Sequence, residues 1–144
     1  MDAMLIRVAD AVVQVLQTGS FRWPFSVERS YLPRHSPQQL KTRTVTVVPA
    51  GWSSELASRR TVRRDCLIHV GLQQKLTDES NTEIDSLVSL GQELEEHLRG
   101  LGRLPTVDAT LVAVEALAAP LDTEDLDQRR VFTTVMSFTF RILE

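Results

Sequence analysis

The spacing of apolar residues changes several times along the chain, and each change marks a predicted element. Near the N-terminus, six apolar residues recur at intervals of three and four, the period of one helix face. These residues are Leu5, Val8, Ala9, Val12, Val15 and Leu16. Asp2 is placed to cap this helix and Gly19 to end it. An irregular connection through Pro24 should follow, because proline cannot sit inside a helix.

Strand-like alternation then replaces the helical period. Apolar and polar residues alternate over 25–31, and β-branched residues dominate 40–48. Residues 49–51, Pro-Ala-Gly, interrupt the second of these strands. A third strand, over 66–72, places its apolar residues on one face. We therefore expect the second and third strands to form a hairpin with a long basic tip, residues 52–64.

A second amphipathic helix follows. Residues 80–83, Ser-Asn-Thr-Glu, have the spacing of a capping box, and Gly100, Gly102 and Pro105 mark the end of the helix. Six residues form its predicted apolar stripe: Ile84, Leu87, Val88, Leu94, Leu98 and Leu101. Glu93 is among the residues expected to face water on the opposite side.

Two more strands complete the order, at 110–117 and 131–143, separated by an acidic loop at 120–130. The chain thus reads as helix, three strands, helix and two strands, within a single domain over 1–144. Two amphipathic helices and a largely antiparallel five-stranded sheet should pack as two layers, with both helices on one face. The predicted fold class is α+β.

Composition narrows the class of protein without identifying it. The 144 residues are 42% hydrophobic and 24% charged, as in an ordinary globular domain, and the net charge of -3 is not that of a polycation seeking nucleic acid. The single cysteine, Cys66, excludes an intramolecular disulfide and fits a reducing compartment. With no signal-peptide pattern and no apolar run of about 18 residues, we expect a soluble protein made in a cytoplasm.

Groups suited to catalysis are few. Cys66 and His69 lie three apart in a predicted strand, so their side chains should point to opposite faces instead of toward one metal ion. The sequence contains no glycine-rich phosphate motif and no Gly-x-Ser-x-Gly motif. Glu93, Glu95 and Glu96 fall on a polar helix face, where carboxylates are usually solvated. We expect no metal, no cofactor and no enzymatic activity, although a site assembled from dispersed residues remains an alternative.

The strongest local charges point to an interface. The basic segment 59–64 carries Arg59, Arg60, Arg63 and Arg64, and the acidic loop carries Asp122, Glu124, Asp125 and Asp127. One basic and one acidic projection suit head-to-tail association, which can close a ring. Trp52, beside the basic segment, is either a core plug or an interface anchor. A basic tip that is simply solvated, or one that contacts nucleic acid phosphates, remains an alternative.

The complete order resembles the tail terminator family of long-tailed bacteriophages and related tail-like particles, including the minor tail protein U family of lambda and similar head-tail joining proteins. The resemblance lies in the order of the elements and in the general residue pattern, and it covers nearly all of the chain. Besides the second helix and the closing strand pair, it includes residues 6–13, 25–31, 45–49 and 65–73. No individual functional residue carries over from it.

The resemblance implies a structural virion protein with no cofactor. Such terminators form hexameric rings that cap the tail tube, stop its growth and dock to the head connector. The partners implied are therefore other copies of the chain, the tube protein and a connector or stopper protein, with DNA passing through without specific binding. The implied place is the head-tail junction, after assembly in the host cytoplasm. A neck adaptor on the portal side, or a nucleic-acid-binding module that uses residues 59–64, is the alternative.

Overall fold

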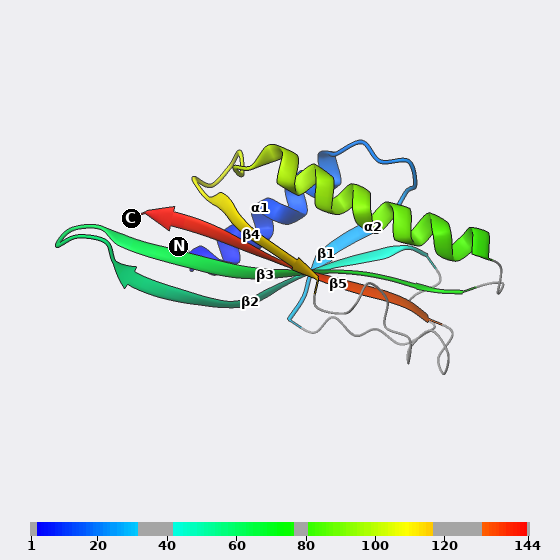
Figure 1. Ribbon diagram of the computed structural model, residues 1–144, viewed down its shortest axis with the longest axis horizontal. Coiled ribbons are helices and arrows are strands. Elements are labelled where there is room, and N and C mark those ends of the chain that lie inside the picture. The colour runs from blue at the N-terminus through cyan, green and yellow to red at the C-terminus, as the bar shows by residue number, and fades with distance from the viewer. Residues whose placement is uncertain (1–2, 32–41, 77–80, 117–130, 144) are drawn as a thin grey trace.

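The computed structural model describes residues 3–31, 42–76, 81–116 and 131–143. The elements, in chain order, are α1 (Met4–Thr18), β1 (Ser26–Arg29), β2 (Thr44–Leu56), β3 (Val62–Lys75), α2 (Asn81–Leu101), β4 (Thr110–Ala116) and β5 (Val131–Leu143). Both helices lie on one side of a five-stranded sheet (Figure 1). The predicted α+β class, element order and two-layer architecture are confirmed.

The sheet is mostly antiparallel, with the strand order β1-β2-β3-β5-β4. Three neighbouring pairs are antiparallel, and β1 is the exception because it pairs in parallel with β2. This parallel pairing runs only from Ser26 opposite Thr44 to Arg29 opposite Val47. Beyond Val47, the outer edge of β2 therefore has no neighbouring strand among the described residues.

The β2–β3 hairpin departs from the prediction. Although residues 49–51 were expected to end a strand, β2 continues through them to Leu56, with a register shift between Pro49 and Gly51. A bulge on an edge strand tolerates a proline, because no ladder hydrogen bond has to come from its missing N–H. The turn is consequently short, with Ala57 and Ser58 donating backbone hydrogen bonds to the Thr61 carbonyl at 2.9 and 3.2 Å. The long tip predicted over 52–64 is wrong.

The core lies between the sheet and the two helices. From α1 it takes Val8, Ala9, Ala11, Val12, Val15 and Leu16, and from α2 it takes Leu87, Leu90, Gly91, Leu94 and Leu98. Phe132, Phe138 and Phe140 of β5 are fully buried against them. The predicted stripe of α2 was partly wrong, since Val88 and Leu101 are 39% and 43% exposed. Only one narrow stripe of a helix can face a sheet, and the stripe through Leu90 and Gly91 is the one that does.

The helix ends also bear on the predictions. The residue before α1 is Ala3, which makes no side-chain cap, while the predicted caps Asp2 and Ser80 lie outside the described residues. Gly19 follows the end of α1 as predicted, and Gly102 follows α2 with a φ of 66°. This positive φ suits glycine, which has no Cβ to clash in a left-handed conformation.

Candidate interaction surfaces

Within the described ranges, no cluster of three or more histidine, cysteine, aspartate or glutamate residues could hold a metal ion. Cys66 is a buried thiol facing the core. His69 lies three residues after Cys66 in β3. Because three is an odd number, its side chain lies on the opposite face of the sheet. Burial lowers the pKa of His69 below its usual 6.5, so the imidazole is neutral at physiological pH.

A membrane-spanning segment is not evident: no helix in the part of the chain that the structure describes is long and apolar enough to cross a membrane.

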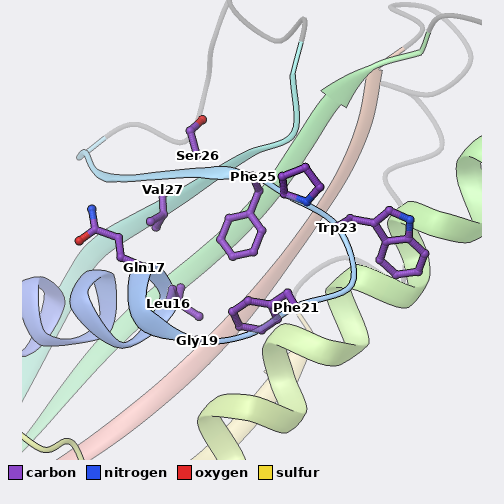
Figure 2. A pocket seen from close by; sticks show the side chains of 9 residues that line it. Leu16, Gln17, Gly19, Phe21, Trp23, Phe25, Ser26 and Val27 are labelled. Carbon is purple, nitrogen blue, oxygen red and sulfur yellow. The ribbon is translucent and has the colours of Figure 1, made fainter.

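A hollow of about 420 Å³ lies between the end of α1 and β1 (Figure 2). Its lining residues are Leu16, Gln17, Gly19, Phe21, Trp23, Pro24, Phe25, Ser26 and Val27. The Phe21 ring meets Phe25 and His97 edge to face, with both centroid distances at 5.1 Å. None of these lining side chains carries a charge, an imidazole or a thiol, so the hollow fits aromatic packing better than acid–base chemistry.

The four predicted arginines do not form one patch. Arg59 and Arg60 are exposed in the short turn. Arg63 forms an ion pair with Glu55 across the hairpin, so much of its charge is already balanced. The Nε of Arg64, on the opposite strand face, donates to the Ser54 hydroxyl at 3.3 Å. The acidic loop residues Asp122, Glu124, Asp125 and Asp127 lie outside the described residues.

The outer part of the β2–β3 hairpin, residues 52–64, which we call the arm, lies at the left of Figure 1, and its end extends past the helices and the other strands. Trp52 and Leu56 are 65% and 76% exposed on it. They lie four positions apart along β2, an even number, and therefore share one face. Trp52 is thus not a core plug, and the sequence hypothesis of an interface anchor stays open as a prediction.

An ion pair that the sequence analysis missed holds the base of the arm. Arg141 of β5 donates to both carboxylate oxygens of Asp65 in β3, from Nε at 2.9 Å and from an Nη at 3.2 Å. These hydrogen bonds are the main reason that the pKa of Asp65 is lowered from 3.8, and they raise the pKa of Arg141. The two residues are far apart in the chain and become neighbours only because β3 pairs with β5, so no local sequence pattern predicts the ion pair.

A second missed feature is a groove of about 260 Å³ between α2 and the strands β4 and β5. It is lined by Val88, Gly91, Gln92, Glu95, Val114, Phe132, Thr134 and Met136. Its rim is polar and acidic, because Glu95 lines it and the Gln92 amide donates to the Glu96 carboxylate at 3.0 Å. The sequence analysis placed Val88 in the core. The glycine at position 91 did not by itself indicate a hollow.

Comparison with known proteins identifies the fold class and one particular neighbour. No protein-family model matches the sequence, and no curated protein gives a significant match. Among solved structures, the chain is similar to the sheath/tube terminator, in its extended state, of an extracellular contractile injection system, PVC, with a TM-score of 0.56 and 9% sequence identity. The similarity covers 100% of this chain and 58% of that chain, so this chain spans little more than half the neighbour's length. At this identity the likeness concerns the fold, and a relationship to lambda minor tail protein U stays a prediction.

Proposed function

We propose that this protein is a tail terminator, which assembles as a ring on the end of a tail tube, ends its elongation and supplies the surface for the next component. The observation that carries the proposal is the fold shared, over the whole chain, with a sheath/tube terminator. The expected partners are further copies of the chain, the tube protein and a head connector, and the expected place is the end of a tail. A hexameric ring, by the family resemblance, is part of the proposal.

Two surface features support a structural role over an enzymatic one. The arm exposes the large apolar side chains of Trp52 and Leu56, which add nothing to the core of a monomer. The groove beside α2 has an apolar floor. The hollow between α1 and β1 contains no acid–base group. We therefore propose that the protein acts through its surfaces and has no enzymatic activity.

The test is to produce the parent particle without this protein and to measure tail lengths by electron microscopy. Without a terminator, subunits should keep adding to the tube, so tails should be longer and more variable. Supplying the protein in trans should restore the narrow length distribution. Tails of normal length would contradict the proposal, and normal tails that fail to join heads would indicate a neck adaptor instead.

A further inference from the structure

The tip of the arm and the far end of the groove lie at opposite ends of the same sheet, whereas Trp52, opposite Cys66, and Met136, opposite Val70, lie four residues apart along β3. Leu56 at the arm pairs with Val62 of β3, whereas Phe132 at the groove pairs with Gln74 near the other end of β3. At about 3.3 Å per residue, these two points are about 40 Å apart along the strand. Because the arm continues β2 and β3 within the same sheet as β5, it cannot fold back onto its own groove, although it could reach the groove of a second molecule.

The two surfaces are complementary in apolar character and in charge. The arm presents an exposed indole and an exposed leucine side chain, and the groove has an apolar floor formed by Val114, Phe132 and Met136. The exposed arginines of the arm tip, Arg59 and Arg60, carry the charge opposite to that of Glu95, which lines the groove, and of Glu96, which accepts a hydrogen bond from the lining residue Gln92. An aromatic anchor entering an apolar pocket with a charged rim is typical of interface hot spots.

From this geometry we propose that the arm of one copy docks into the α2–β5 groove of a second copy, with Trp52 and Leu56 on the groove floor and Arg59 and Arg60 against Glu95 and Glu96. The contact joins two different surfaces of the same chain, so it repeats head to tail and closes a ring when the rotation permits. The inference deepens the proposed terminator ring and rests on it for its setting. It uses only described residues, whereas the contact predicted through the acidic residues of 122–127 lies outside them and stays a prediction.

The first test uses two full-length variants that each lack one half of the contact. Trp52→Ala removes the anchor and leaves the groove, whereas Val88→Glu places a charge in the groove and leaves the arm. Both positions are exposed, so neither change should disturb the core. Each variant alone should self-associate at least about tenfold more weakly in sedimentation velocity. Tyr31→Ala, which removes a 61% exposed aromatic outside the arm, is the matched control.

Mixing the two variants distinguishes a head-to-tail contact from a symmetric one. The intact arm of Val88→Glu can still enter the intact groove of Trp52→Ala, but the remaining groove and arm of that pair are both defective. The mixture should therefore form a one-to-one dimer and grow no further. A mixture with no dimer, or a Trp52→Ala variant that associates like the wild type, overturns the proposal.

Cysteine cross-linking detects the contact even where association is weak. Leu56→Cys in one preparation and Val88→Cys in another should cross-link on mild oxidation at high protein concentration, while the native Cys66 is buried. The control pair is Tyr31→Cys with Val88→Cys. Equal cross-linking of the two pairs overturns the proposal, including for a protein that is monomeric when dilute.

Charge exchange tests the rim. Arg59→Glu with Arg60→Glu should weaken association, and adding Glu95→Arg with Glu96→Arg in the same chain should restore it. If the arginine variant instead loses salt-sensitive binding to duplex DNA with no change in self-association, the arm binds nucleic acid and the proposal fails. These outcomes concern the contact alone: overlong tails in the absence of the protein would leave the terminator role standing even if this contact is refuted.

Discussion

At the scale of single residues, Gly19 is constrained by space and not by backbone conformation. Its φ of -72° is available to any residue. A Cβ there would lie 2.7 Å from Cε2 of Phe21 and 2.9 Å from Nε2 of His97, closer than such atoms approach. Phe21 is in turn held by its edge contacts with Phe25 and His97, so the ring cannot move aside alone.

We therefore predict that Gly19→Ala lowers the free energy of unfolding by about 1–3 kcal/mol, because an overpacked site must shift several rings. Urea denaturation followed by circular dichroism measures the change. Gly100→Ala is the control, since nothing lies within 4 Å of a Cβ at that helical position. The control should be neutral or slightly stabilising. Equal stabilities for the two variants would show that the aromatic cluster yields easily.

His69 predicts a pH dependence. Its pKa is lowered in the folded protein by burial, so as pH falls the unfolded chain takes up the proton first. The free energy of unfolding should therefore fall as pH drops below about 6.5, and His69→Gln should reduce that slope. The pKa of Asp65 is also lowered, but its contribution is lost only below about pH 4. An unchanged slope in His69→Gln would contradict the assignment.

At the scale of elements, uninterrupted periodicity is what the sequence predicts well. β5 has the predicted bounds at both ends because apolar residues recur on one face along most of its length, up to Ile142. The sequence analysis ended β2 too early because it judged Pro49 only from its neighbours in the chain. The bulge at this point depends instead on the partner strand, where Ile68 and Leu67 lie opposite. The groove could not be predicted because it arises where α2 and β5, distant in sequence, approach at Gly91.

Substitutions at Gly91 test how closely α2 packs on β5. A Cβ there would lie 3.6 Å from Cγ2 of Thr134 and 3.9 Å from Cδ2 of Leu72, which is ordinary contact. Gly91→Ala should thus be neutral or raise the free energy of unfolding by up to about 1 kcal/mol through helix propensity. Gly91→Leu should lower it by about 1–3 kcal/mol by pushing α2 off the sheet. Thermal unfolding compares the two, and a Leu variant as stable as the Ala variant would contradict close packing of α2 on β5.

At the scale of the whole molecule, one core cluster joins residues from both helices and from β2, β3 and β5. A single contiguous core among the described residues predicts that the protein unfolds as one unit, and the single domain expected over 1–144 stays a prediction. The sequence could predict this layout, but not which surfaces stay uncovered, because exposure of Trp52 and Val88 depends on where the packed layers end.

The two tryptophans permit a test of one-unit unfolding. In Trp52→Phe, the half-buried Trp23 is the only indole left, so fluorescence reports on the connection between α1 and β1. Its unfolding midpoint in urea should coincide with that from far-ultraviolet circular dichroism, which reports on the whole sheet and both helices. Separate midpoints would mean that the α1–β1 region unfolds independently.

The continuity of β3 from the arm into the sheet has a mechanical consequence. A pull on the arm along its length reaches a strand hydrogen-bonded on both sides, by β2 and by β5, and tied to β5 at its base by Asp65 and Arg141. Such a load acts in shear, so many ladder hydrogen bonds must break together before the strand slides. A subunit gripped by this arm would hold its neighbour under tension, where a flexible loop would simply stretch.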